Sequence, residues 1–505
     1  MNPDPDELID PALYQAAIDF LYSRINYEKG HAPYSASNYR LDRMRRLLEL
    51  LDNPQSRYQI VHVAGTKGKG TTSNAIAALL HACGFRVGVY TSPHLLRLEE
   101  RIHCIGRDCT AAELVSLVDR MRHAADVLEA EGSGRPTFFE LTTAMGMLRF
   151  AEVGCDYVVL EVGLGGRLDS TNVCQPAICA ITSISLDHQA QLGDTIAKIA
   201  AEKAGIIKRS IPVISSARHP DARSVITSTA HEQDAKLFLI DRDFSVQWQP
   251  VPLDPMLLIT GGGSLSGHLG QQATVATEGK EKLDLAKASA RALIEYCTLL
   301  PDSWLGNGQW QLPLLGRHQA DNLACALTVL DVLAKSWSQP RASLLELQSA
   351  ILGLKVPARL QVVGTSPIQI IDTAHNTASI TATMDALDVH FPNMPRTIVF
   401  ASSRDKDYEE MLQILMTRCQ QIVLTAYQNN VRGLSLVELQ SAAQAVARQV
   451  TESSANSNRS VHIAQVLSAP DAKEAWQLAK RSTSANEILC GTGSFFLAAE
   501  LLAIV

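Results

Sequence analysis

The feature that most constrains the fold is a short apolar run, Gln59–Ala64, that leads directly into the glycine- and lysine-rich stretch Gly65-Thr-Lys-Gly-Lys-Gly-Thr71. A buried strand, a glycine turn and a helix from about Thr71 would place backbone N–H groups and a helix dipole around phosphate oxygens. Lys69 would contact the terminal phosphates of a nucleotide, and Thr71 would face Mg²⁺. The strict pattern has its hydroxyl residue directly after the lysine, whereas here Gly70 intervenes. A turn with only a structural role would be weakened by so many glycines, so we predict that this stretch binds a ligand as a phosphate loop.

Strand-like and helical runs alternate on both sides of an irregular stretch at 250–285. Before it, helical residues 8–51 and the strand Gln59–Ala64 are followed by strands expected at Arg86–Thr91, Tyr157–Val162, Ala177–Ser183 and Pro212–Ser216. After it, strands are expected at Ile368–Ile371, Thr397–Ala401, Gln421–Thr425, Val461–Gln465 and Glu487–Leu489, with a helix at Leu434–Val450. Such alternation is typical of doubly wound, mostly parallel α/β sheets.

The length of 505 residues favours at least two domains, because a single core stops growing near roughly 250–300 residues. We predict a phosphate-loop α/β domain over residues 1–356, with N-terminal helices and an irregular insert near 250–285. A hinge is expected at 357–366. A smaller, Rossmann-like α/β domain is expected over 367–505.

The composition gives no sign of a nucleic-acid or membrane partner. Net charge is -7, from 45 basic and 52 acidic residues, so there is no basic footprint. The first ten residues lack the basic start and apolar run of a secretory signal, and no apolar run reaches the length of a membrane span. The ten cysteines form no CxxC pair, so reduced thiols are expected. We therefore predict a cytoplasmic protein that needs clustered cations or a metal to hold an anionic ligand.

Two further strand ends carry side chains that suit a metal. Glu161 ends the apolar run Tyr157–Leu160, and His188 follows a later strand. Ligands of open α/β sheets collect at the carboxyl ends of the strands, and a carboxylate there suits a Mg²⁺ that bridges phosphates. Taken alone, Glu161 is equally well explained as a solvated carboxylate, and His188 as a packed or capping residue. Their placement at strand ends near the loop favours a site.

A series of short motifs follows in a fixed order along the chain. The motifs are Gly65–Thr71, Thr91-Ser-Pro-His94, Phe139-Glu140 with Thr143, Glu161–Asn172, Leu186-Asp-His188, Glu202–Ile206, Leu315–Asn322, Pro357–Leu360 and Asp372-Thr-Ala-His375-Asn376. Together they resemble the folylpolyglutamate synthase and dihydrofolate synthase family of the Mur ligase superfamily, over roughly residues 10–495. The chain departs from the usual pattern at four positions: Lys67 stands where Asn is commoner, Thr71 replaces Ser, and Thr373 and Thr377 replace Gly and Pro.

The resemblance implies an ATP-dependent ligase that phosphorylates a substrate carboxylate. The amine of L-glutamate then attacks the acyl phosphate, leaving an amide, ADP and phosphate. Such phosphoryl transfer needs mainly alignment and cancellation of negative charge. The implied substrates are dihydropteroate, reduced folates or both, with L-glutamate. ATP and one or two Mg²⁺ ions are the implied cofactors, and the enzyme is expected to be a monomer.

The resemblance also assigns site residues. Those expected to bind ATP are Gly65, Thr66, Lys67, Gly68, Lys69, Gly70, Thr71, Asn322, Arg359 and Asp372. Those expected to bind the metal are Ser92, Glu161 and His188, with Thr71. Those expected on the pterin side are Thr137, Phe138, Phe139, Glu140, Leu168, Asp169 and Ser170, with His375 and Asn376 near the glutamate or the phosphates. Lys69, His188 and Lys203 are the expected catalytic residues, with Lys203 carbamylated; the alternative is an unmodified lysine paired with Glu202, Asp187 or a phosphate.

Other functions fit parts of this pattern. A cell-wall precursor ligase of the same superfamily would lack the folate-type Thr-Ser-Pro-His stretch. A P-loop switch or kinase-like ATPase would not need the Asp-x-Ala-His-Asn set, and a degenerate nucleotide-binding module would not need Lys69, Glu161 and His188 together. The sequence leaves open whether the enzyme adds the first glutamate to dihydropteroate, extends polyglutamate tails, or does both; we favour both.

Overall fold

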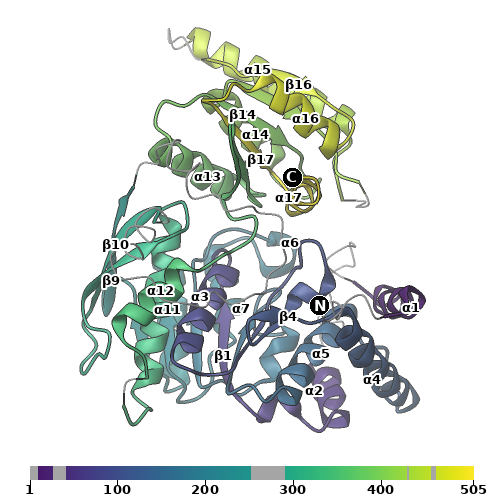
Figure 1. The fold of residues 1–505 in the computed structure, drawn as a ribbon, viewed down its shortest axis with the longest axis vertical. Helices are drawn as coiled ribbons and strands as arrows, with labels where there is room; N and C mark the ends of the chain where they lie inside the picture. The colour runs from purple at the N-terminus through teal and green to yellow at the C-terminus, as the bar shows by residue number, and fades with distance from the viewer. Residues whose placement is uncertain (1–8, 27–40, 252–289, 340, 429–431, 457–461) are drawn as a thin grey trace, which may run out of the picture.

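The computed structural model describes residues 9–26, 41–251, 290–339, 341–428, 432–456 and 462–505. These residues form two lobes, with the N-terminal part of the chain in the lower lobe of Figure 1 and the C-terminal part in the upper lobe. Beyond residue 251, the predicted insert near 250–285 lies outside the described residues.

The lower lobe is built on an eight-stranded sheet in the order β4-β3-β2-β5-β1-β6-β7-β8. Its strands are β1 Gln59–Ala64, β2 Val87–Tyr90, β3 Ile102–Cys104, β4 Arg107–Asp108, β5 Tyr157–Glu161, β6 Ile178–Ile181, β7 Val213–Ser215 and β8 Leu237–Leu239. Strands β2, β5, β1, β6, β7 and β8 run parallel, and β3 and β4 extend the edge antiparallel. The central strands are buried on both faces, as parallel sheets require.

Helices cover both faces of this sheet because alternate residues of its strands point to opposite sides. Val159 packs with α3, α11 and α12 on one face, whereas Val158 and Leu160 pack with α1, α2, α4 and α5 on the other. Helices α7 and α8 extend this second layer. The helices are α1 Pro11–Tyr22, α2 Leu41–Leu50, α3 Lys69–Ala82, α4 Ala111–Ala130, α5 Phe138–Glu152, α6 Gln189–Leu192, α7 Ile196–Ala204, α8 Pro220–Glu232, α11 His318–Ala334 and α12 Leu344–Leu352, with short 3₁₀ turns at Pro54–Ser56, Leu98–Arg101 and Ser170–Val173.

A three-stranded antiparallel sheet, which the sequence did not lead us to expect, stands beside α11. Its strands are β9 Phe244–Pro250, β10 Ala292–Thr298 and β11 Gly308–Leu312. Trp310 and Tyr296 of this sheet are buried in the core that α3 and α11 share. The sheet therefore supports α11, which in turn packs against α3, the helix that follows the phosphate loop.

The upper lobe holds a six-stranded sheet in the order β12-β13-β17-β14-β15-β16, parallel except for β12. Its strands are β12 Gln361–Thr365, β13 Ile368–Ile371, β14 Arg396–Phe400, β15 Gln421–Leu424, β16 Gln465–Ser468 and β17 Ile488–Thr492. Helices α13 Thr377–His390, α14 Tyr408–Arg418 and α15 Leu436–Asn456 pack on one face, and α16 Ala472–Ser482 and α17 Phe495–Leu502 on the other.

The predicted fold class, a doubly wound phosphate-loop domain followed by a smaller α/β domain, is confirmed. One predicted strand, Val461–Gln465, is misplaced: its first residue lies outside the described residues, and the observed strand is β16 at Gln465–Ser468. This edge strand is half exposed and lacks the apolar signal of its buried neighbours. Part of the predicted hinge at 357–366 is also a strand, since β12 pairs with β13. The limits of the two domains stay a prediction.

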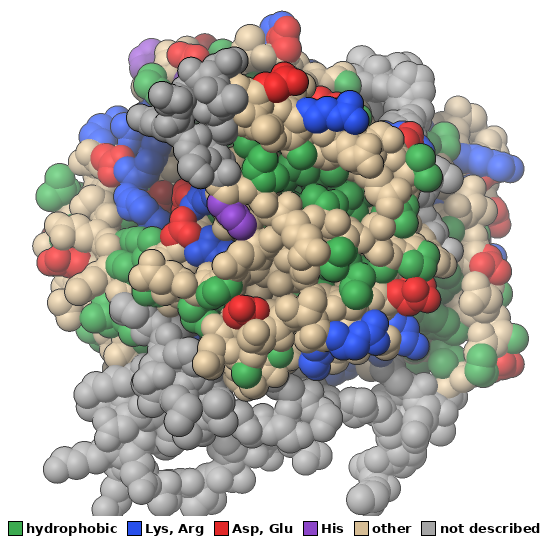
Figure 2. Space-filling view, turned by 90° about the horizontal axis from the view of Figure 1, so that it is seen from above, with side chains coloured by type: hydrophobic (Ala, Val, Ile, Leu, Met, Phe, Trp, Pro, Cys, Tyr) green, Lys and Arg blue, Asp and Glu red, His purple; other side chains and the backbone are tan. Residues whose placement is uncertain are grey.

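No helix within the described ranges is long and apolar enough to cross a membrane. On the face shown in Figure 2, Lys and Arg side chains alternate with Asp and Glu rather than gathering into one large patch.

Candidate active site

A cavity of about 1340 Å³ lies between the lobes. It opens where β1, β5 and β6 end and where α13 begins, which is the usual place for a ligand in an open α/β sheet. The predicted site residues that line it are Gly65, Thr66, Lys67, Gly68, Lys69, Gly70, Thr71, Ser92, Thr137, Phe139, Glu140, Glu161, Leu168, Asp169, Ser170, His188, Lys203, Asn322, Arg359, Asp372, His375 and Asn376. Phe138 is not among the lining residues.

The phosphate loop joins β1 to α3, which begins at Lys69. Gly68 has a φ of +86°, and a Cβ at this position would lie 2.1 Å from Oδ1 of Asn322. Only glycine fits this conformation and this contact. The loop is fastened to the end of β6, because the hydroxyl groups of Thr182 and Ser183 donate to the Lys67 carbonyl at 2.8 and 3.1 Å. The first N–H groups of α3 therefore face the cavity in a fixed arrangement that suits phosphate oxygens.

Glu161 ends β5 at the floor of the cavity, with 5% of its surface exposed. Burial raises the pKa of its carboxyl group, against the opposing effects of Lys69, Arg359 and the Ser92 backbone N–H. The Lys69 ammonium lies 4.0 Å from Oε1. A buried carboxylate in this setting needs a cation beside it to stay ionised.

Asp169 shapes the cavity wall. Its Oδ2 accepts from the backbone N–H groups of Gly163 and Leu164 at 3.0 and 2.9 Å, and its Oδ1 accepts from Thr171. These bonds hold the glycine-rich turn after β5 against the cavity. The Asp169 carboxylate therefore contributes to ligand binding mainly by fixing the backbone of the glycine-rich turn that lines the cavity.

The predicted pterin side lies at the start of α5. Thr137 caps this helix, and the Glu140 carboxylate accepts from Thr137 and from Nε of Arg43 at 3.0 Å. Phe138 departs from the prediction: it is fully buried and stacks on the ring of Tyr22, with centroids 5.3 Å apart. Consecutive helical side chains point about 100° apart, so Phe138 faces the core while its neighbour lines the cavity.

The upper lobe contributes the loop between β13 and α13. The Asp372 carboxylate accepts from the backbone N–H groups of Leu360 and Ala374, both at 2.9 Å. The Asn376 side chain caps α13 by accepting from Ser379 at 2.9 Å. These two predicted ligand contacts therefore also fix the backbone that presents His375.

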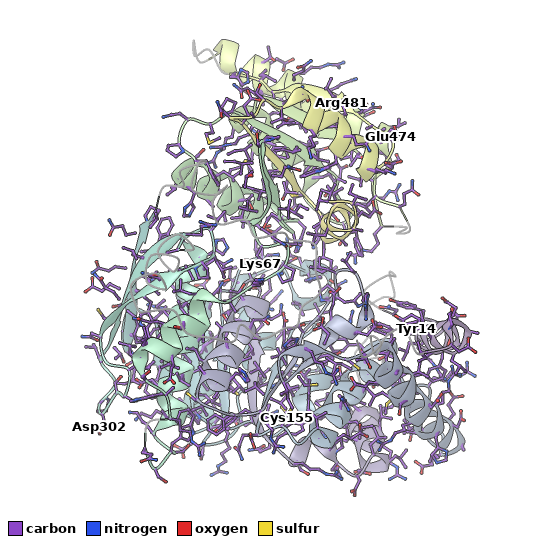
Figure 3. The ribbon with its side chains drawn as sticks, viewed as in Figure 1. Tyr14, Lys67, Cys155, Asp302, Glu474 and Arg481 are labelled. Carbon is purple, nitrogen blue, oxygen red and sulfur yellow. The ribbon has the colours of Figure 1, made fainter. Side chains whose placement is uncertain are left out.

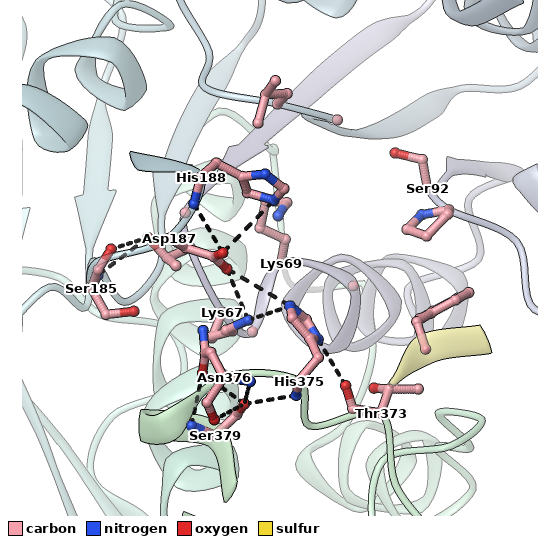
Figure 4. A pocket seen from close by; sticks show the side chains of 18 of the residues that line it. Lys67, Lys69, Ser92, Ser185, Asp187, His188, Thr373, His375, Asn376 and Ser379 are labelled. Carbon is pink, nitrogen blue, oxygen red and sulfur yellow. Dashed lines mark hydrogen bonds and ion pairs between the residues drawn. The ribbon is translucent and has the colours of Figure 1, made fainter. Parts of the chain in front are cut away.

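Four side chains from the two lobes form a cluster of charged and polar groups, which we call the interlobe cluster: Lys67, Asp187, His375 and Lys406. Figure 4 shows the first three of them. Burial alone would raise the pKa of Asp187, but the neighbouring Lys67 ammonium and the contacts with histidines and Lys406 hold it well below its usual value. Lys406 was missed by the sequence reasoning. Its signal was the charged run Asp405-Lys-Asp407 that follows a predicted strand.

His188 and Lys203 lie on the lower lobe side of the same cavity. Burial lowers the pKa of His188 to about 3, so its imidazole is neutral near pH 7. Burial, followed by the nearby Lys69 charge, lowers the pKa of Lys203 to about 7. The Lys203 amine donates to the Gly65 carbonyl at 2.9 Å, directly beneath the phosphate loop. Its neighbour Glu202 pairs instead with Arg167 at 2.8 Å.

Comparison with known proteins agrees with this arrangement. Residues 63–237 match the Mur ligase middle domain, and residues 358–495 match the Mur ligase, glutamate ligase domain. The chain is similar to the folylpolyglutamate synthase of Lacticaseibacillus casei, with 33% identity over 78% of this chain and 82% of the relative. It is also similar to the dihydrofolate synthase/folylpolyglutamate synthase of Bacillus subtilis, with 32% identity over 80% of this chain and 83% of the relative.

A solved FPGS–AMPPCP–folate complex superposes with a TM-score of 0.70 and 28% identity, over 97% of this chain and 100% of that one. The similarity thus extends through both lobes and across the cavity between them. The chain belongs to the folylpolyglutamate synthase and dihydrofolate synthase family of Mur ligases.

Proposed function

We propose that this protein uses ATP to join L-glutamate to a folate. The observation that carries this proposal is the meeting of a phosphate loop, the buried Glu161 and the His375 loop of the other lobe in one cavity. A ligase of this kind must hold a nucleotide, a carboxylate and an amine together, which requires walls from both lobes. The family relative named for both activities and the relative solved with AMPPCP and folate support the same assignment.

The phosphate loop supplies fixed positive charge for phosphoryl transfer. The N–H groups at the start of α3 and the Lys69 ammonium would hold the β- and γ-phosphates of ATP. The substrate carboxylate would accept the phosphoryl group, which makes it a good acylating group. The amine of L-glutamate would then displace phosphate and form the amide. Lys69 favours the phosphoryl transfer because its ammonium group stabilises the negative charge that develops on the phosphate oxygens.

The described residues fit a Mg²⁺ that is held mainly by phosphates and water. Within the described ranges, no three His, Cys, Asp or Glu side chains lie together in a group able to hold a metal ion. Mg²⁺ in phosphoryl-transfer sites usually has only one or two protein carboxylates. Glu161, with Ser92, Thr71 and the neutral His188, would hold it here. The metal would neutralise charge on the phosphates, while Glu161 and Lys69 fix where that charge can lie.

We also propose that Lys203 is carbamylated. Its buried amine has a pKa of about 7, so a large fraction is neutral and nucleophilic at that pH. The nitrogen would attack the carbon of CO₂, forming an N–C bond while one C=O pair moves to oxygen and a proton leaves to solvent. The product is an anionic carbamate whose remaining N–H still donates to the Gly65 carbonyl. The Lys203→Ala variant should be nearly inactive and should recover partly with a short added carboxylate. Loss of activity without such recovery would contradict carbamylation and indicate that the lysine acts unmodified.

The decisive experiment measures phosphate release with ATP, Mg²⁺ and L-glutamate, and compares dihydropteroate with tetrahydrofolate as acceptor. We expect release with both acceptors, since we propose both activities. Release with one acceptor would assign a single activity, and release only with a nucleotide-linked muramyl peptide would refute the folate assignment. Size-exclusion chromatography during the same preparation would test the monomer that we propose, and cell fractionation its cytoplasmic location.

A further inference from the structure

Lys67 occupies the contact between the lobes rather than the phosphate cradle alone (Figure 3). Its Nζ lies 3.0 Å from Oδ2 of Asp187 in the lower lobe and 2.9 Å from Nε2 of His375 in the upper lobe. The backbone of Lys67 is fixed by Thr182 and Ser183, so the side chain reaches across from a rigid base.

The direction of the Lys67–His375 hydrogen bond follows from the other ring nitrogen. Nδ1 of His375 lies 2.9 Å from the Thr373 carbonyl, which only accepts. Nδ1 must therefore carry the proton, and Nε2 of the neutral ring presents a lone pair. The Lys67 ammonium donates to that lone pair. Figure 4 shows this chain of contacts running from Asp187 through Lys67 to the His375 loop.

Asp187 completes the bridge from the other side. Its Oδ1 lies 3.1 Å from Nζ of Lys406, which follows β14 in the upper lobe. Its side chain has 7% of its surface exposed and that of Lys406 has 12%, so solvent screens this contact little. Each oxygen of one lower-lobe carboxylate is thus bound to a lysine, one from the phosphate loop and one from the opposite lobe.

We propose that Lys67 is a positioning residue that couples the phosphate loop to the upper lobe, so that the His375 loop and Lys406 are held over the cavity before nucleotide binds. Asn cannot take this role, because its amide ends several bonds short of the lysine ammonium and carries no charge. The inference deepens the proposed function, since it gives Lys67 a part in presenting the second substrate rather than in binding ATP. Disrupting these contacts between the lobes should therefore weaken the binding of L-glutamate more than the binding of nucleotide.

The test substitutes Lys67→Asn in the full chain and compares it with Lys198→Asn. Lys198 lies on α7 and forms an exposed pair with Asp194, which precedes that helix, so the same chemical change there should alter nothing measured. Small-angle scattering without nucleotide should show a larger radius of gyration for Lys67→Asn than for the wild type. The KM for glutamate should rise about tenfold, the factor expected for one charge-assisted hydrogen bond, while the Kd for ADP stays within about twofold.

Two further variants separate positioning from folding. Lys67→Arg keeps the charge and several donors, so it should restore part of the closed scattering profile and of the glutamate KM. Lys406→Met removes the second bridge without touching the loop and should open the lobes in the same way. The double variant removes both of these contacts between the lobes, Lys67 to His375 and Asp187 to Lys406, so it should open the lobes further than either single variant.

Three results would overturn the inference. The first is a Lys67→Asn protein with wild-type scattering and glutamate KM. The second is an ADP Kd that rises as much as the glutamate KM, which would make Lys67 an ordinary nucleotide contact. The third, available even if Lys67→Asn fails to fold, is an unchanged scattering profile for Lys406→Met. Scattering and ADP binding need no turnover, so they test the bridge even if the proposed ligase activity fails.

Discussion

Replacing Gly68 by alanine tests whether the phosphate loop requires a residue without a side chain at this position. Gly68 combines a φ of +86° with a neighbour, Oδ1 of Asn322, only 2.1 Å from where a Cβ would stand. A matched control is Gly84, just beyond the other end of α3, whose φ is +81° and whose added Cβ would meet nothing within 4 Å. The two substitutions therefore share the backbone strain and differ in the steric clash.

The magnitudes follow from these two contributions. Left-handed backbone costs an alanine roughly 1–2 kcal/mol, which is all that Gly84→Ala should lose. Overpacking adds roughly 1–3 kcal/mol, so Gly68→Ala should lose about 2–5 kcal/mol in total. The Asn322 side chain must also move away from its 2.9 Å hydrogen bond to Gln319, which shifts the loop.

Scanning calorimetry at one scan rate would compare wild type, Gly68→Ala and Gly84→Ala, and titration calorimetry would measure ADP binding. We expect Gly68→Ala to unfold at the lowest temperature and to weaken ADP by at least about tenfold, equivalent to roughly 1.4 kcal/mol. Gly84→Ala should bind ADP normally. Adding Asn322→Ala to Gly68→Ala should recover part of the stability by removing the obstructing atom. Equal unfolding temperatures for the two glycine variants, with normal ADP binding, would refute the reasoning.

Other predictions follow from the same cavity. Lys69→Met should abolish phosphate release while leaving the circular dichroism spectrum unchanged, because the lysine faces ligand; near-normal turnover would exclude the loop assignment. Glu161→Gln should lower activity by at least roughly a hundredfold, with partial recovery at high Mg²⁺, whereas wild-type activity at ordinary Mg²⁺ would place Glu161 outside the metal site. ATP should reduce protease cleavage at 355–366 further, because Arg359 would add a nucleotide contact to lobes that the Lys67 bridge already holds together, and identical digests would argue against that contact. Burial lowers the pKa of His62 to about 3. As pH falls below the ordinary pKa of histidine, the unfolded chain therefore binds a proton that the folded chain does not, and the free energy of unfolding should drop by about 1.4 kcal/mol per pH unit. The substitution His62→Gln should flatten this pH dependence, measured by urea unfolding between pH 6 and 4.5.

The local motifs were predictable because each rests on short-range backbone chemistry. The strand Gln59–Ala64 and its glycine loop occur where the sequence placed them, since a buried strand followed by glycines leaves few alternatives. The edge strand β16 and the sheet β9–β11 were not predicted correctly. The edge strand β16 is partly exposed, so its apolar pattern is weak. Strand β9 alternates apolar and polar residues, but it borders the stretch that we interpreted as irregular, and it pairs with β10 only through a long connection.

The sequence by itself determined the chemistry available to this protein: a phosphate loop, strand-end carboxylates and histidines, and two α/β units. The tertiary structure alone decided how those groups are used. In the folded chain the Phe138 side chain is buried in the core, and the Asp169 carboxylate binds backbone N–H groups. Lys67 and Lys406 both bind one carboxylate, that of Asp187. Lys67 and Lys406 lie on different lobes and far apart in the chain. No local pattern encodes that meeting, because it depends on the packing of one sheet domain against another.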